Sequence, residues 1–146
     1  MQSTLVMIKP NGVLNGIIGN IISRYERSRL TLSAIKIKRP TEEEVRGFYA
    51  EHQEKPFFPK LLKFMTSGPV AFMVLSGENA ITSARTINGA TSPEDAAPGT
   101  IRYDFAPDTT RNVVHSSDSP ESAEREIDFW FNDNELISYP AISFKC

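Results

Sequence analysis

The apolar pattern in the first forty residues predicts strand, helix and strand in turn. Residues 4–9 are apolar and prone to β structure, and residues 10–12 follow them as a Pro-Asn-Gly turn. Apolar side chains between residues 17 and 25 recur at helical spacing, which predicts an amphipathic helix. Residues 30–38 alternate like a half-buried strand, and their apolar phase slips by one at Ala34, which indicates a β-bulge.

Start and stop signals mark three helices in the middle of the chain. Thr41 and Glu44 match a capping box, in which each side chain accepts a bond from the other's backbone N–H, so a helix begins there. The apolar positions of this helix are Val45, Phe48 and Tyr49. A second short helix is predicted from Phe57, and a third over residues 80–88, with Gly89 as its stop.

The remaining segments complete the prediction. Residues 70–75 are apolar throughout and predict a fully buried central strand. Residues 89–118 show little periodicity and predict a long loop of functional rather than architectural use. Ser119 and Pro120 suit the start of a last helix, and residues 136–139 suit a final strand. The apolar stripe of that last helix is Ala123, Ile127, Trp130 and Phe131.

This order of elements predicts an α+β sandwich, with helices packed on a mostly antiparallel sheet. The 146 residues have no internal repeat or linker and are interpreted as one domain, residues 1–146. Sixteen Lys and Arg against eighteen Asp and Glu give a net charge of −2, which weighs against dedicated nucleic-acid or membrane-surface binding. No membrane span and no secretory signal are predicted. The single Cys146 excludes an internal disulfide and suits a reducing, cytoplasmic compartment.

A histidine just before the last helix is the strongest candidate for chemistry. His115 lies four residues before Ser119. Glu126 lies seven residues after Ser119, about 60° from the centre of the apolar stripe of the last helix. A carboxylate at the edge of a buried face is partly desolvated and needs a partner, which His115 or Ser117 could supply. An imidazole fixed in one tautomer can act as a nucleophile. The spacing also fits a surface histidine and a Glu126 paired with Arg125 or water.

Several cations and uncharged donors could surround this histidine if the fold brings them together. They are Lys9 at the end of the first strand, Arg85, Arg102, Arg111, Thr91 and Asn112. Such a set would position a transferred phosphoryl group and neutralise its charge. Each of these residues taken alone also fits a solvated surface position.

The common phosphate-binding loops and metal motifs are missing from the sequence. A nucleotide would therefore be held by side chains. Phe57 or Phe58 could stack on a base, although filling the core suits Phe58 better. His52 has no motif around it and is interpreted as a surface residue.

Taken together, the chain resembles the nucleoside diphosphate kinase family over essentially its whole length. The matching segments are residues 4–10, 48–49, 55–58, 64–70, 89–91, 98–102 and 112–119. Each segment is a moderate signal, and their shared order and spacing are very specific.

The resemblance implies a ferredoxin-like α/β sandwich with a four-stranded sheet, assembled into homo-hexamers or homo-tetramers. It also implies a ping-pong reaction that balances nucleotide pools. A nucleoside triphosphate would pass its γ-phosphate to a histidine, and the phosphohistidine would then phosphorylate a different nucleoside diphosphate. Mg²⁺ would arrive with the nucleotide, held mainly by phosphates and water, so that no metal ligands are expected from the protein.

By the same resemblance, His115 would be the nucleophile, and Glu126 with Ser117 would orient it. Phe57 would stack on the base with little selectivity. The phosphates and ribose would be held by Lys9, Tyr49, Arg85, Thr91, Arg102 and Asn112.

Two positions depart from the family pattern. Asn11 stands where Asp is usual, and a structural effect only is expected. Ser116 stands where Gly is usual, so a positive φ or a close backbone approach there would cost about 1 kcal/mol of strain and reduce turnover. On that view Ser116→Gly raises the rate or leaves it unchanged.

Two alternatives to an active kinase follow from other features. A nucleotide-binding regulatory paralogue with weakened or absent catalysis is favoured only by Ser116. A nucleic-acid-binding module would use the basic loop and Phe57, and the acidic net charge opposes it.

Overall fold

The structure is a computed structural model that describes residues 1–140, and Cys146 lies outside the described residues. Four strands form one sheet in the order β2-β3-β1-β4. They are β1 Gln2–Ile8, β2 Thr31–Lys38, β3 Val70–Gly77 and β4 Val114–Ser116. Each neighbouring pair is antiparallel, so the predicted antiparallel sheet is confirmed.

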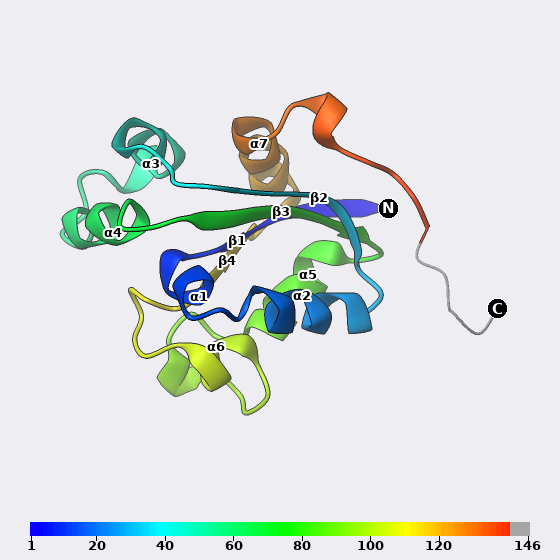
Figure 1. Ribbon diagram of the computed structural model, residues 1–146, viewed down its shortest axis with the longest axis horizontal. Helices are drawn as coiled ribbons and strands as arrows, with labels where there is room; N and C mark the ends of the chain where they lie inside the picture. Colours follow the sequence, from blue (N-terminus) through cyan, green and yellow to red (C-terminus); the bar gives the residue numbers. More distant parts are fainter. Residues whose placement is uncertain (141–146) are drawn as a thin grey trace.

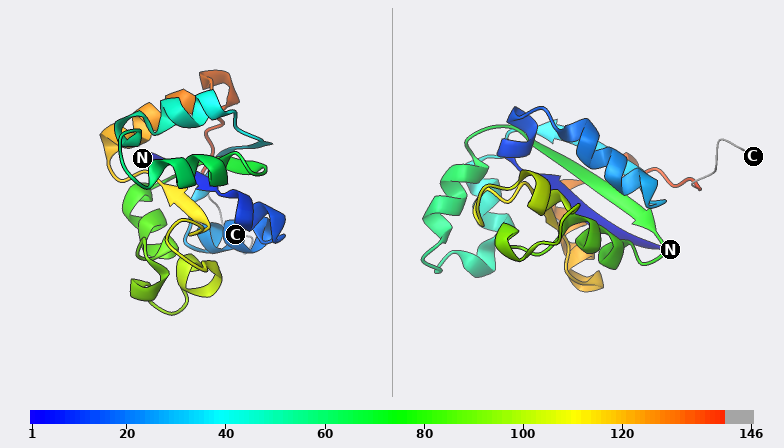
Figure 2. Two further views of the ribbon diagram at one scale, coloured as in Figure 1. Left: turned by 90° about the vertical axis from the view of Figure 1, so that its left-hand side faces the viewer. Right: turned by 90° about the horizontal axis from the view of Figure 1, so that it is seen from below.

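Helices cover both faces of this sheet, with α2 Ile18–Arg27 and α5 Ala80–Asn88 on one face and α3 Glu42–Phe48 and α7 Pro120–Trp130 on the other (Figure 1). The shorter helices are α1 Pro10–Leu14, α4 Phe58–Met65 and α6 Ile101–Phe105. Single 3₁₀ turns occur at Ala50–His52, Pro93–Asp95 and Asp133–Glu135. The side and bottom views show the same layers, which is the α+β sandwich predicted from the sequence (Figure 2).

Alternation along β1 gives each face of the sheet its own apolar core, because successive side chains of a strand point to opposite faces. Val6 and Ile8 pack with Tyr25 of α2 and Ala84 of α5. On the other face the core is built from Leu5, Met7, Val45, Phe72 and Trp130. The central strand β3 is buried along its whole length, as its apolar run predicted.

Most of the local signals in the sequence are confirmed. Thr41 and Glu44 form both bonds of the capping box at α3. The register of β2 shifts between Leu32 and Ala34, where the phase slip indicated a bulge. Ser119 caps α7, because its Oγ accepts a bond from the backbone N–H of Ser122.

The fourth strand and the Pro-Asn-Gly segment were predicted wrongly. β4 lies inside the presumed loop, where three residues are too few to reveal an alternation. The structure assigns no strand to residues 136–139, although the backbone N–H of Ile137 donates to the carbonyl of Ser33 beside β2. Residues 10–14 form a helical turn rather than a β-turn, since proline suits the first position of a helix.

Candidate active site

A cavity of about 320 Å³ opens between the end of β1, β4 and α7, and His115 lines it. Seven other predicted site residues line the same cavity, namely Lys9, Tyr49, Arg85, Thr91, Arg102, Asn112 and Glu126. They come from segments that lie far apart in the sequence. The fold therefore produces the convergence that spacing alone left open.

The carboxylate of Glu126 holds the imidazole of His115 from the last helix. Glu126 Oε1 lies 2.9 Å from His115 Nε2 and accepts a second bond, 2.8 Å long, from the hydroxyl of Ser117. That hydroxyl in turn accepts the backbone N–H of Leu5 on β1, so it is fixed by the sheet. Glu126 is buried, and it bonds to both His115 and Ser117, with no described bond to Arg125.

Lys9 is buried at the end of β1, where β1 passes into α1. Its backbone N–H donates to the carbonyl of Val113, and its Nζ donates to Asn112 Oδ1 over 2.7 Å. Burial, together with the neighbouring guanidinium of Arg102, lowers the pKa of the Lys9 ammonium to about 7. A phosphate group in the cavity would favour the charged form.

Arg102 bridges two backbone carbonyls that flank the cavity. Its Nη1 donates to the carbonyl of Gly89 and its Nη2 to that of Val114, each over 2.7 Å. Gly89 ends α5 with φ +87°, and a Cβ there would lie 2.5 Å from Thr100 Oγ1, so this sharp exit requires glycine. Thr91 follows, and its carbonyl accepts the side-chain amide of Asn112.

The backbone is strained two residues before the histidine. Val113 has φ +74°, a conformation that β-branched residues rarely adopt. Its carbonyl binds the Lys9 N–H and its side chain is buried, so the surrounding structure holds this conformation in place. Strain of this kind often accompanies functional sites.

Aromatic rings form the wall of the cavity next to His115. Two of these residues, Phe48 and His52, were given no role in the site from the sequence. Phe48 of α3 meets the His115 ring edge to face at 5.5 Å. His52 lines the cavity instead of standing apart at the surface, and its ring lies 5.8 Å from that of Phe57. The available signal was spacing: His52 lies four residues after Phe48, so the two would share a face if the helix that starts at Thr41 continued that far.

Phe57 and Phe58 take different places, as the sequence analysis allowed. Phe58 is buried in the core, whereas Phe57 is 50% exposed and is not among the described residues that line the cavity. Burial, reinforced by the Glu126 carboxylate, raises the pKa of the Tyr49 phenol, which therefore remains a neutral donor. Hydrogen bonding from Ser122, with Arg85 nearby, holds the pKa of Asp118 below its usual range.

Three expectations about single residues change. Arg111 pairs with Asp108 at the surface and does not join the cavity. Ser116 lies within β4 and is not among the described residues with positive φ, so the predicted strain is wrong at Ser116 and falls at Val113. Asn11 donates from its side-chain amide to the carbonyl of Arg111, which a carboxylate could not do.

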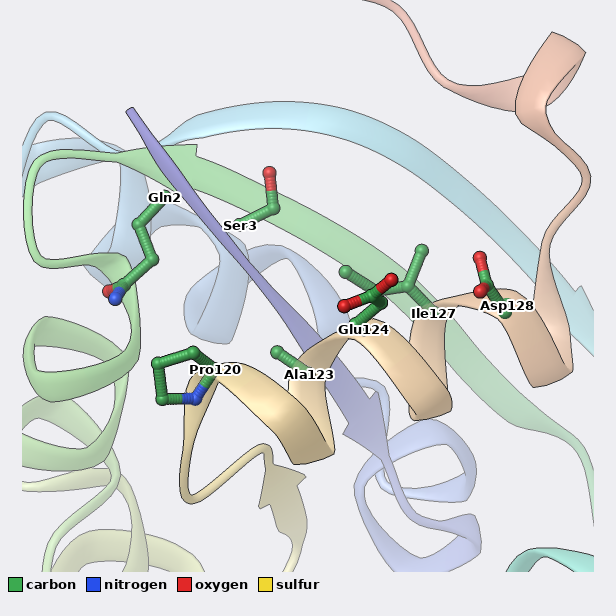
Figure 3. Close-up of a pocket in the computed structure, with 7 residues that line it drawn as sticks. All are labelled: Gln2, Ser3, Pro120, Ala123, Glu124, Ile127 and Asp128. Atoms are coloured by element: carbon green, nitrogen blue, oxygen red, sulfur yellow. The ribbon is translucent and has the colours of Figure 1, made fainter.

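A second cavity, of about 310 Å³, lies between the start of β1 and α7 and offers different chemistry (Figure 3). Two carboxylates, Glu124 and Asp128, line it, but none of the described lining residues is a cation or a histidine. The cavity around His115 is therefore the candidate active site.

Comparison with known proteins identifies the family of this chain. The family model described as nucleoside diphosphate kinase matches residues 2–136. The chain belongs to the nucleoside diphosphate kinase family. It is an enzyme of nucleotide phosphotransfer, which moves phosphate between nucleoside triphosphates and diphosphates.

Individual relatives and structures resemble the enzyme along most of its length. A nucleoside diphosphate kinase of Archaeoglobus fulgidus is 52% identical, over 95% of this chain and 92% of its own. One from Caldanaerobacter subterraneus is 56% identical over 90% of this chain and 94% of its own. The crystal structure of the Halobacterium salinarum enzyme in complex with CDP matches with a TM-score of 0.91 and 45% identity, over 94% of this chain and 92% of that chain. These names give no support to a paralogue without catalysis.

Proposed function

We propose that the enzyme transfers the γ-phosphate through a phosphohistidine on His115, by a ping-pong sequence. The observation that carries this proposal is the bond between Glu126 Oε1 and His115 Nε2. A carboxylate partner favours the tautomer with its proton on Nε2. The lone pair on Nδ1 is then free to attack phosphorus.

In the first half-reaction Nδ1 attacks the γ-phosphorus of a bound triphosphate. The Nδ1–P bond forms while the bond from phosphorus to the β,γ-bridging oxygen breaks, and its electron pair leaves on the nucleoside diphosphate. The ring becomes positively charged, and the Glu126 carboxylate stabilises that charge at Nε2. A different nucleoside diphosphate then accepts the phosphate by the same step in reverse.

The cations of the cavity would hold the phosphates. Lys9, Arg85 and Arg102 supply charge, and the groups that would bind phosphate and ribose as uncharged donors are Tyr49, Thr91 and Asn112. Phe57, exposed beside His52, would give a base one aromatic face, which tolerates any base. The related Halobacterium salinarum enzyme was solved in complex with CDP, which supports nucleotide binding by this chain.

We propose Mg²⁺ as the cofactor that accompanies the nucleotide. Among residues 1–140 no group of three or more His, Cys, Asp or Glu side chains is arranged to hold a metal ion, and the cavity's cations suit phosphate oxygens instead. When bound with the phosphates, Mg²⁺ would neutralise charge on the transferred group. Asp118, the carboxylate beside Arg85 in the lining, would hold a water of the ion.

As for its setting, we propose one cytoplasmic domain, residues 1–146, that assembles as a homo-hexamer or homo-tetramer. The edge strand β2 exposes Ile35 and Ile37, a surface that a second copy can cover. Within residues 1–140 no helix combines the length and apolar content needed to cross a membrane.

The nucleophile can be identified by incubation with γ-labelled ATP. We expect one acid-labile, alkali-stable phosphate per chain, present in the wild type and lost in His115→Ala, which should still fold and bind nucleotide. The chain has one other histidine, so His52→Ala is the matched variant and should retain the label. Label that persists in His115→Ala, or a wild type that takes up none, would contradict the proposal.

A further inference from the structure

A chain of buried polar side chains lies behind β4, on the face of the sheet that the catalytic histidine does not use. The Tyr25 hydroxyl of α2 donates to Asn88 Oδ1 of α5, and Asn88 Nδ2 donates over 3.0 Å to the Ser116 hydroxyl. Tyr25 and Asn88 are fully buried and Ser116 is 6% exposed. Buried amide and hydroxyl groups in this setting depend on each other for hydrogen bonds, since water does not reach them.

The position of Ser116 makes this chain relevant to the reaction. Ser116 follows His115 in β4, where the two residues pair with Val6 and Met7 of β1. Neighbouring side chains of a strand point to opposite faces, so the Ser116 hydroxyl meets Asn88 near the core that contains Tyr25, while the His115 ring meets Glu126. Ser116 also lines the edge of the cavity. A bond that holds Ser116 thus holds the backbone that carries the nucleophile.

A second bridge joins the same two elements. Asn88 is the last residue of α5 and Gly89 is its cap, and the carbonyl of Gly89 accepts from Arg102, which also donates to the carbonyl of Val114. Asn88 and Gly89 are therefore tied to the residues on either side of His115. The same helix carries Arg85 into the cavity. The two bridges together fix the position of His115 relative to Arg85 and Arg102.

We propose that Tyr25, Asn88 and Ser116 form a positioning network that fixes His115 relative to the phosphate-holding Arg85 and Arg102. The inference rests on the proposed function. A glycine at position 116, which the family resemblance led us to expect, could not accept the bond from Asn88, so the network depends on this chain's own residue. Displacement of a reacting group by about 1 Å can slow a reaction about a hundredfold, so a network that fixes His115 can have a large effect on the rate of phosphate transfer.

The test measures single-turnover phosphorylation of the enzyme by ATP, the Kd for ADP and the thermal midpoint. In Ser116→Ala and Ser116→Gly we expect transfer to slow by about 10- to 100-fold with the Kd for ADP changed less than about threefold. The midpoint should fall by about 5 °C, because Asn88 Nδ2 loses its buried acceptor.

A matched control and a triple variant separate positioning from mere stability. Ser76→Ala also removes a buried, hydrogen-bonded serine of the sheet, bonded to Ser33 away from the cavity, and should lower the midpoint without slowing transfer. Ser116→Ala combined with Asn88→Leu and Tyr25→Phe leaves neither an unpaired amide nor an unpaired hydroxyl, so the midpoint should recover while transfer stays slow.

Two results would overturn the network: unchanged transfer in Ser116→Ala, or recovery of rate together with stability in the triple variant. The amount of label taken up on His115 and the rate of its uptake distinguish failure of this inference from failure of the proposed function. If the wild type takes up label on His115 and Ser116→Ala does so equally fast, the network alone fails. If the wild type takes up no label, the proposed function fails as well.

Discussion

The Oε1 atom of Glu126 accepts from both His115 and Ser117, and the Ser117 hydroxyl accepts from β1. The imidazole is therefore oriented by a helix and a strand at once, which fixes its tautomer and leaves little rotational freedom. Orientation of this kind raises a rate through preorganisation rather than through tighter binding.

At the same scale, the buried Lys9 makes a pH-dependent prediction. Its pKa of about 7 in the fold lies below its ordinary value of 10.5, so between these values the unfolded chain binds more protons than the folded one. The free energy of unfolding then rises with pH over this window, by at most about 1.4 kcal/mol per pH unit. Lys9→Met removes this contribution.

We expect Lys9→Met to have its largest stability advantage over the wild type at pH 6, with the difference shrinking toward pH 10, while phosphorylation slows about a hundredfold. Urea unfolding at several pH values and single-turnover kinetics measure the two effects. Lys63→Met, an exposed lysine of α4, is the control and should show neither. A stability difference independent of pH would contradict the assignment.

At the scale of elements, the site depends on β4, the shortest strand. It has three residues and pairs with β1 along its whole length, and a strained Val113 precedes it. The carbonyl bonds to Lys9 and Arg102 hold it from both sides. A strand this short is positioned by its neighbours rather than by its own propensity.

The cap of α7 allows a prediction for that helix. Ser119 Oγ accepts the Ser122 N–H, so Ser119→Ala should cost about 1 kcal/mol and lower the thermal midpoint by about 3 °C. Phosphate transfer should change by less than about threefold, because Glu126 lies almost two turns inside the helix. Ser119→Asp should restore the midpoint, and an equally low midpoint in both variants would show that the cap does not hold α7.

For the whole molecule, the exposed edge of the sheet predicts how assembly responds to charge. Ile35 is 46% and Ile37 is 56% exposed on β2. In the proposed assembly, Ile37→Glu would bury a carboxylate under the second copy, so sedimentation should show a smaller species. Lys60→Glu, an exposed charge change on α4, should assemble like the wild type. Unchanged assembly of Ile37→Glu would place the contact elsewhere.

The local elements could be predicted because their signals lie within a few residues of one another. Thr41 caps α3, Gly89 ends α5 and the apolar run of β3 is buried, each as its pattern indicated. β4 could not be found in the same way, since its partner β1 lies more than a hundred residues earlier in the chain. Residues 136–139 were wrongly predicted as a strand for a related reason, because local sequence does not show whether a segment finds a pairing partner.

Residue types and spacing determined the family, the helix caps, the central strand and the candidates for the site. Only the tertiary structure decided which candidates meet: it brought Lys9, Arg85 and Arg102 to one cavity and left Arg111 paired with Asp108 outside it. It also turned Ser116 from an expected site of strain into an acceptor for Asn88. The physical reason is that caps and periodicity act over a few residues, whereas convergence of charges and burial of polar groups arise only from long-range packing.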